Sequence, residues 1–344
     1  MTSPEHDRAR VLAAARTEFT ERGYRSAELG LIAARAGLTG DAVQSHFPGK
    51  QALYFSVLAE AAEQAPEPAY PPTARTAEAA LGDFARAWLA RLPLATDEQR
   101  SPARLGRDLL PEVLADERTS QAYAQLSNLT AIVLGLALEN LPPGAPRMVR
   151  VAEAALTTLQ GAGQLAAAAP GFGEPFAMVA VCEMLAGLRL DDDWRPPHLP
   201  FVPKAARVDE PWSPPVLPDA LRAEPARLDG DGVVAVLGLH RLGAVEEAVR
   251  AAPAGAQVTL ALVADRPSPL ARLVVAELRA DLRAAFPAAA RPRLQIVHDD
   301  AGALAAAAGL AGCSDATEFA VRVAAGRIVA RADGYGACYA AATG

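Results

Sequence analysis

The stretch from Arg8 to Leu58, RARVLAAARTEFTERGYRSAELGLIAARAGLTGDAVQSHFPGKQALYFSVL, decides the fold of the N-terminal part of this chain. Its first segment has apolar residues at i, i+4 and i+8, which predicts a helix with one apolar face: Val11, Ala15 and Phe19. Glu18 and Arg22 are expected on the opposite, polar face. Gly23 then ends the helix, because glycine readily takes the left-handed conformation found at helix C-termini.

Two shorter helices are predicted after this one. Ser26 can cap the second helix, and Gly37 ends it with a tight turn. Thr39 caps the third helix, whose apolar anchor is the i, i+4 pair Val43 and Phe47. Two helices joined by a glycine-containing turn, with polar side chains pointing outward from the second, are typical of a helix-turn-helix unit that enters the major groove of DNA.

This pattern resembles the TetR family of bacterial one-component regulators. The residues that carry the resemblance are Ala14, Ala15, Phe19, Gly23, Tyr24, the run Ile32–Gly37, Thr39, His46, Phe47, Lys50, Ala52 and Leu53. The resemblance implies a repressor that binds a palindromic double-stranded DNA operator as a homodimer. The residues that it places at the DNA are Ser26, Thr39, Gly40, Asp41, Gln44, Ser45, His46 and Lys50.

The third helix also departs from the family. Members usually place a Tyr, often beside a basic residue, late in this helix, whereas this chain has Gln44 and Ser45 there and Asp41 near the start. Acidic residues offset the arginines along the segment, so there is no basic stripe to neutralise phosphates, and a carboxylate facing the groove is repelled unless it accepts from a cytosine amino group. A dimeric ligand-binding scaffold with weakened or lost DNA binding is therefore the alternative function.

Length and composition set further limits. The chain has 344 residues, more than the two-part architecture of the family needs, and its net charge of −7 argues against general coating of nucleic acid. Three cysteines without a CxxC motif suggest neither a disulfide framework nor a zinc site. The sequence shows no secretion signal and no membrane span. We expect a cytoplasmic protein without a metal or cofactor.

The proline-rich run Glu63–Pro72 separates the DNA-binding domain, residues 1–64, from a second domain, residues 72–190. Five helical stretches are predicted in the second domain: Ala77–Leu94, Ala103–Ala115 with a break or kink at Pro111, Ser120–Leu141, Pro146–Ala169 and Pro175–Leu190. The last two are rich in small residues and poor in charge, so they need apolar partners. In the family this pair forms a four-helix bundle with its copy, which implies a homodimer.

The resemblance also implies that an unknown small-molecule effector enters the helical domain and changes the spacing of the two recognition helices. Candidate pocket residues are those on the apolar faces of the middle helices, with two polar orienters among them: Phe84, Trp88, Leu109, Tyr123, Gln125 and Asn128. Ordinary core packing is the alternative for each of them.

Residues 191–228 are dense in proline and predict an extended linker. Its aromatic residues, Trp194, Phe201 and Trp212, are expected either to lie against a flanking domain or to be incidental parts of a tether.

Residues 229–344 predict an α/β domain, because continuous apolar runs alternate with helical ones. The predicted order is a parallel sheet finished by a hairpin that turns at Ala325 and Gly326. This order resembles the thioredoxin-like fold, and the run from Asp299 to Gly334 is similar to the back half of a peroxiredoxin. The chain is thus predicted to be multidomain, all-α and then α/β, with a C-terminal domain that folds independently behind its linker.

Thiol catalysis would need a cysteine after the first strand of this domain, where a helix N-terminus lowers the thiol pKa. Residues His240 to Ala244 contain none, so we expect no enzyme, although a thiol peroxidase or reductase remains the third alternative. Cys313 and Cys338 flank the predicted hairpin and are a possible redox pair; the other interpretation is two separate apolar side chains. Cys182 is expected to pack in the helical domain.

Overall fold

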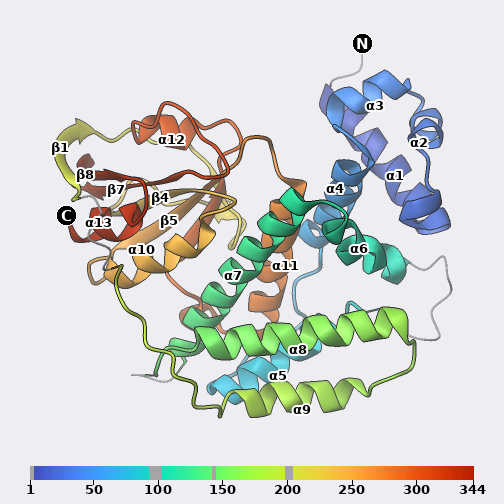
Figure 1. The fold of residues 1–344 in the computed structure, drawn as a ribbon, viewed down its shortest axis with the longest axis horizontal. Coiled ribbons are helices and arrows are strands. Elements are labelled where there is room, and N and C mark those ends of the chain that lie inside the picture. Colours follow the sequence, from blue (N-terminus) through green and yellow to red (C-terminus); the bar gives the residue numbers. More distant parts are fainter. Residues whose placement is uncertain (1–3, 93–101, 142–144, 198–203) are drawn as a thin grey trace.

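The computed structural model describes residues 4–92, 102–141, 145–197 and 204–344. Within these residues a helical half lies against a half built on a six-stranded sheet. Figure 1 shows the N-terminal helices at the upper right and the sheet at the left, with two long helices, α7 (Glu117–Glu139) and α11 (Pro269–Ala285), between them. The predicted change from all-α to α/β along the chain is therefore observed.

The N-terminal unit consists of four helices: α1 (Pro4–Ser26), α2 (Leu29–Ala36), α3 (Gly40–His46) and α4 (Lys50–Glu63). Gly37 ends α2 in the left-handed conformation, with φ of 65°. The Thr39 hydroxyl caps α3 as predicted, because its oxygen accepts a hydrogen bond from the backbone N–H of Ala42 at 3.3 Å. The arrangement of α2, turn and α3 is a helix-turn-helix.

Two expectations for this unit are wrong. Ser26 does not cap α2: α1 continues through Ser26 across a kink at Gly23, where φ is 74°, and Glu28 precedes α2 without a side-chain cap. Glu18 does not lie on a polar face, because it is buried and forms ion pairs with Arg22 at 2.8 Å and Arg35 at 3.3 Å. The ion pair with Arg35 joins α1 to α2, which explains a buried carboxylate at this position.

The second helical group contains α5 (Ala77–Leu89), a 3-10 helix (Pro102–Asp108), α6 (Leu109–Leu114), α7, α8 (Val149–Ala168) and α9 (Pro175–Leu185). The five predicted stretches are present, mostly with shorter bounds. The break predicted at Pro111 falls just before it, at the start of α6, since proline is tolerated in the first turn of a helix. A Cβ on Gly135 of α7 would lie 2.8 Å from the backbone of Val149, so glycine permits α7 and α8 to approach closely.

The six strands follow the order β1-β8-β7-β4-β5-β6. Their bounds are β1 (Ala206–Pro211), β4 (Gly232–Gly238), β5 (Gln257–Val263), β6 (Leu294–His298), β7 (Glu318–Ala324) and β8 (Arg327–Asp333), and a separate pair is formed by β2 (Pro218–Asp219) and β3 (Glu224–Pro225). Strands β4, β5 and β6 are parallel, and β7 and β8 form the predicted hairpin, whose turn is Ala325 and Gly326. The thioredoxin-like assignment of this sheet stays a prediction.

Alternate residues of β4 point to two separate apolar clusters, so both faces of the sheet are covered. One face packs against α10 (Val245–Ala251) and α13 (Ala337–Thr343), a terminal helix that the sequence did not reveal. The other face packs against α12 (Ala303–Ala307) and Trp212.

Much of the segment predicted as a linker belongs to the sheet half. β1 pairs with β8, and Trp212 is buried, with its indole N–H donating to the carbonyl of Leu228 at 2.5 Å. The ring of Trp194 lies 6.4 Å from that of Tyr339 on α13. Phe201 lies outside the described residues. Trp194 and Trp212 therefore anchor the segment to the α/β half, and the simple tether does not describe it.

Helix α11 departs most from the expected independent domain. It follows β5 in the chain, yet it packs along α4 and also contacts α5 and α7 of the helical half. Arg279 donates to the carbonyl of Glu63 at 2.9 Å, and Arg283 pairs with Glu67 at 3.0 Å. Because one helix of the C-terminal half forms part of the helical core, the two halves share apolar packing.

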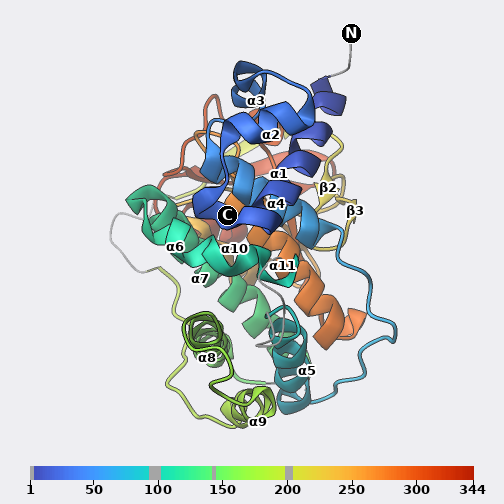
Figure 2. The same cartoon turned by 90° about the vertical axis from the view of Figure 1, so that its right-hand side faces the viewer.

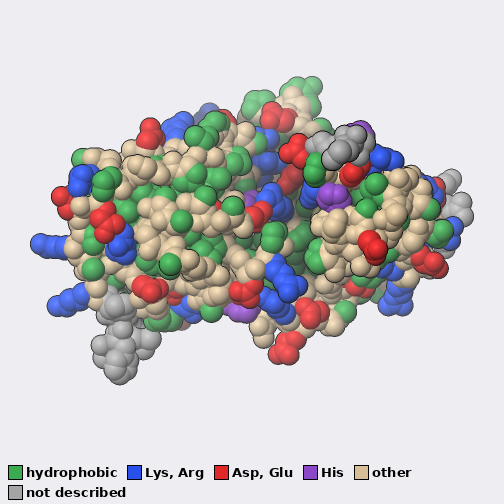
Figure 3. All heavy atoms as spheres, turned by 90° about the horizontal axis from the view of Figure 1, so that it is seen from above, with side chains coloured by type: hydrophobic (Ala, Val, Ile, Leu, Met, Phe, Trp, Pro, Cys, Tyr) green, Lys and Arg blue, Asp and Glu red, His purple; other side chains and the backbone are tan. Residues whose placement is uncertain are grey.

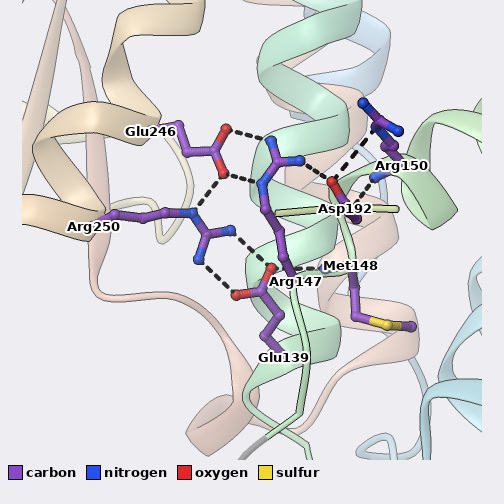
Figure 4. Close-up of polar contacts among 7 residues, drawn as sticks. All are labelled: Glu139, Arg147, Met148, Arg150, Asp192, Glu246 and Arg250. Atoms are coloured by element: carbon purple, nitrogen blue, oxygen red, sulfur yellow. Dashed lines mark hydrogen bonds and ion pairs between the residues drawn. The ribbon is translucent and has the colours of Figure 1, made fainter. Parts of the chain in front are cut away.

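A network of ion pairs also joins the halves (Figure 4). Arg147, which precedes α8, contacts Glu246 of α10 at 2.6 Å and also Asp192. Arg250 of α10 contacts Glu246 at 2.6 Å and Glu139 at the end of α7 at 2.9 Å. Burial acts to raise the pKa of Glu246, but hydrogen bonds from the two guanidinium groups lower it below the ordinary glutamate value.

This network predicts how the free energy of unfolding depends on pH in the acid range. A carboxylate whose pKa is lowered in the folded state adds stability above its unfolded pKa, and the contribution is lost as pH falls through the folded pKa. We expect Glu246→Gln to lower the free energy of unfolding by about 2 kcal/mol near neutral pH, because two arginines lose a shared partner. The difference from the unchanged protein, measured by urea unfolding, should shrink as the pH falls below the ordinary glutamate pKa of about 4.3. A difference that is the same at all pH values contradicts this role.

Candidate functional site

Helix α3 lies at one end of the molecule (Figure 1). Val43 and Phe47 are buried and fix the helix against α1 and α2. The exposed side of this turn and helix carries Thr39, Gly40, Asp41, Gln44 and Ser45. The residues predicted to read DNA within α3 therefore share one accessible surface.

These side chains differ in their hydrogen bonds to the rest of the protein. The Ser45 hydroxyl donates to the carbonyl of Ala42 at 2.8 Å, so it bonds to its own helix. Within the part of the chain that the structure describes, the side chains of Asp41 and Gln44 form no hydrogen bond. Gln44 is free to present its amide to a base edge, whereas Asp41 presents a negative charge at the start of the same helix.

Lys50 is held at the edge of this surface. Its ammonium donates to the carbonyl of Arg25 at 3.2 Å and lies 4.6 Å from the ring centroid of Tyr24. Exposed Ser26 follows Arg25 in the kinked end of α1. His46 lies beside Phe47, with 6.5 Å between the ring centroids. Contacts of these residues with phosphate stay predictions.

Charges of both signs alternate over this unit. Figure 3 shows acidic and basic side chains interspersed on the right-hand lobe, which holds the N-terminal helices. Several arginines there pair with carboxylates: Arg16 contacts Glu60 at 3.0 Å, and Arg22 and Arg35 share Glu18. These pairs reduce the number of cations that can face phosphates, in line with the absence of a basic stripe in the sequence.

A second candidate site is a cavity of about 670 Å³ inside the helical half. Four of the residues predicted to form a pocket line it: Phe84, Trp88, Tyr123 and Asn128. The other two predicted residues do not. Leu109 lies at the start of α6, and the side-chain Oε1 of Gln125 accepts from the backbone N–H of Gly243 at 3.4 Å, which joins α7 to the sheet half.

One wall of this cavity was missed by sequence reasoning. It is formed by α11, which contributes two apolar and two acidic side chains: Val274, Glu277, Leu278 and Asp281. Glu277 and Asp281 are four residues apart and thus on one helix face. The four-residue spacing of Glu277 and Asp281 is visible in the sequence. This helix was expected to belong to an independent C-terminal domain, so neither residue was predicted to line the pocket.

The polar groups of the cavity are partly paired. Both terminal nitrogens of Arg91 contact the carboxylate of Asp281, one of them at 3.0 Å. Burial acts to lower the pKa of Arg91, but the negative charge of Asp281 raises it above its ordinary value. The Tyr123 hydroxyl accepts from Gln160 at 3.0 Å, and burial, with the charge of Glu277, raises its pKa to about 12. Burial raises the pKa of Asp281, although the charge and hydrogen bonds of Arg91 act to lower it. The contact between Arg91 and Asp281 joins the end of α5 to α11.

The structure does not bring the predicted redox pair together. Cys338 is buried on the face of the sheet that carries α10 and α13, while Cys313 packs against the cluster on the other face. Both are free thiols, as is buried Cys182. Burial raises the pKa of the Cys338 thiol well above its usual range, which opposes thiolate chemistry.

Two further observations concern the described residues. They contain no group of three or more His, Cys, Asp or Glu side chains arranged to hold a metal ion. None of their helices is both long enough and apolar enough to cross a bilayer.

Comparisons with known proteins agree with the N-terminal geometry. Residues 11–57 match the family described as "Bacterial regulatory proteins, tetR family". No curated protein compared with the chain matches it.

Several solved structures share a partial likeness. The fatty acid degradation regulator FadR from Bacillus halodurans is 17% identical, with a TM-score of 0.34, and the match covers 55% of this chain and 98% of that one. A transcriptional regulator from Rhodococcus sp. Rha1 is 26% identical, with a TM-score of 0.32 and coverage of 54% and 95%. NalD, the secondary repressor of the MexAB-OprM multidrug efflux pump in Pseudomonas aeruginosa, is 19% identical, with a TM-score of 0.33 and coverage of 54% and 96%.

The hydrogen bond from the Ala42 N–H to Thr39 is predicted to stabilise helix α3. Thr39→Ala removes the acceptor for the backbone N–H of Ala42 and should destabilise the protein by about 1 kcal/mol. Thr39→Ser keeps the acceptor and is the matched control. Urea unfolding measures both variants; equal stability of Thr39→Ala and Thr39→Ser would show that the cap adds nothing.

Proposed function

We propose that this chain is a DNA-binding transcriptional regulator that acts as a homodimeric repressor on a palindromic operator and releases it when a small molecule occupies the cavity. The observation that supports this most is the helix-turn-helix of residues 11–57, which matches the tetR family and presents α3 at the surface. The two-fold symmetry of a homodimer suits a palindromic site. Such a protein works in the cytoplasm, where the DNA of a bacterium lies.

The proposed dimer face is α8 with α9. Exposed large apolar side chains gather along these helices and the turns next to them: Leu165, Phe172, Phe176, Met184, Leu188 and Leu190. Figure 2 shows the two helices side by side, at the end of the molecule opposite α2 and α3. An apolar face of this kind is unfavourable in water and favours a second copy as its cover.

Helix α11 provides a physical route from the cavity to DNA. It lines the cavity with Glu277 and Asp281 and packs along α4, which follows the recognition helix. A ligand that fits one position of α11 better than another shifts the balance between two positions of α4. A ligand with equal affinity for both positions has no effect on DNA binding.

The second candidate function is a dimeric ligand-binding scaffold that no longer reads DNA. The observations that favour it are the carboxylate of Asp41 at the exposed start of α3 and the paired arginines of the N-terminal unit. For the C-terminal half we propose a thioredoxin-like domain without catalysis, because residues 240–244, directly after β4, contain no cysteine. Peroxide turnover by the purified protein would instead support a thiol peroxidase.

The DNA-binding proposal predicts a mobility shift with the DNA upstream of the protein's own gene. Gln44→Ala removes the amide that can pair with a base edge, so it should weaken binding to that DNA about tenfold and leave binding to unrelated duplex DNA unchanged. Asp41→Asn removes a negative charge and should strengthen binding to unrelated DNA.

Two results would contradict these assignments. Absence of any shift with the unchanged protein favours the scaffold. A selective loss of binding to the upstream DNA in Asp41→Asn would show that Asp41 reads a cytosine rather than opposing phosphate. Glu78→Gln, an exposed carboxylate on α5, is the control for removal of charge.

The dimer proposal predicts a change of mass. Phe176 is 78% exposed on α9, and Phe176→Glu places a charge on each side of a two-fold face, so the variant should be monomeric. Val216→Glu, at a position 92% exposed in the other half, should remain dimeric. Light scattering at micromolar concentration measures both, and a monomeric unchanged protein rules out the dimer.

A further inference from the structure

The charged side chains around the cavity are mostly acidic. Glu153, Glu277 and Asp281 contribute three carboxylates, and Arg91 is the basic residue among the described residues that line it. Arg91 already holds Asp281 through two hydrogen bonds, so its charge is compensated. The remaining acidic side chains are Glu277 and the exposed Glu153, and an ionised carboxylate there disfavours an anionic ligand.

Glu277, on α11, is the half-buried acidic group of the cavity to which no described residue donates a hydrogen bond. Burial raises its pKa, and Asp281 raises it further, while the charge of Arg91 acts in the opposite direction. A half-buried carboxylate in a cavity is stabilised by a cation that enters beside it.

Aromatic side chains line the same cavity as this carboxylate. Phe84, Trp88 and Tyr123 line the cavity together with apolar residues of α7, α8 and α11. The ring of Trp88 on α5 packs directly against Gly163 of α8. A Cβ at that position would lie 2.8 Å from the ring, so glycine makes room for it. Aromatic faces attract a cation and also cover an apolar body.

We propose that this cavity binds an organic cation, with an ammonium or guanidinium head beside Glu277 and an aromatic or aliphatic body against Trp88 and Phe84. This inference rests on the proposed function in treating the cavity as the effector site. It adds that the recognition charge comes from α11, a helix of the C-terminal half, so the helical half alone has an incomplete site.

The same helix connects the bound cation to α4. On α11, Glu277 lines the cavity, and Arg279, two residues later, bonds to the last residue of α4 through the Glu63 carbonyl. A cation that attracts Glu277 therefore acts on the helix that holds α4, and occupancy of the cavity should lower DNA affinity.

The test uses three probes with one body and different heads: phenylbutylamine, a cation; phenylbutanol, which is neutral; and phenylbutyrate, an anion. Binding to the full chain without DNA is measured by calorimetry at neutral pH. We expect the amine to bind about tenfold more tightly than the alcohol and the anion to bind most weakly. Equal affinities, or tighter binding of phenylbutyrate, overturn the proposal.

Glu277→Gln keeps the size of the side chain and removes its charge. It should abolish the preference for the amine over the alcohol while leaving the alcohol affinity unchanged. Glu78→Gln, on the exposed side of α5, should keep the preference. A preference that survives in Glu277→Gln assigns the charge recognition elsewhere and contradicts the proposal. Thermal unfolding of each variant confirms that a lost preference is not a lost fold.

DNA binding is measured in a separate experiment, so that the regulator proposal and the cation-site proposal can be contradicted independently. A protein that prefers the amine but does not shift its upstream DNA disproves the regulator and keeps the cation site. A protein that shifts the DNA but shows no preference among the three probes disproves the cation site and keeps the regulator.

Discussion

The packing of α11 along α4 is the interaction on which the rest of the structure depends. A helix that follows β5 of the sheet would ordinarily cover that sheet, yet here it completes the core of the helical half. Its buried side chains lie in the same apolar cluster as residues of α4, α5 and α7. The N-terminal unit, the cavity and the sheet half therefore all contact α11. A shift in the position of any one of them changes the packing of α11 against the other two.

Ion pairs reinforce this arrangement at places where the two halves touch. Arg147, Glu246, Arg250 and Glu139 join α7 and α8 to α10, and Arg118 of α7 contacts Asp315 beyond β6 at 2.6 Å. The pairs at α10 are mostly buried, whereas Arg118 is exposed. Buried pairs of this kind fix the orientation of the helices as well as adding free energy. They explain why the α/β half is packed onto the helical half rather than attached to it as a separate unit on a tether.

Sequence reasoning predicted much of the local structure. The periodicity of Val11, Ala15 and Phe19, the cap at Thr39 and the hairpin turn at Gly326 all rest on neighbouring residues, and the structure confirms them. It failed for Glu18, which looks like a surface residue until Arg35 is placed beside it, and for α11, whose amphipathic pattern fits either half. Four of the six predicted pocket residues line the cavity, but its acidic wall depends on a contact between distant segments that no local pattern encodes.

The measurement that tests the central claim most directly is unfolding of a shortened chain that ends at Leu190. This chain keeps α1 to α9 and loses α11, which leaves apolar surface of α4, α5 and α7 without its cover. We predict that thermal unfolding of the shortened chain, followed by circular dichroism, shows no cooperative transition, whereas the full chain unfolds in one. A shortened chain that unfolds cooperatively at the temperature of the full chain would contradict the shared core.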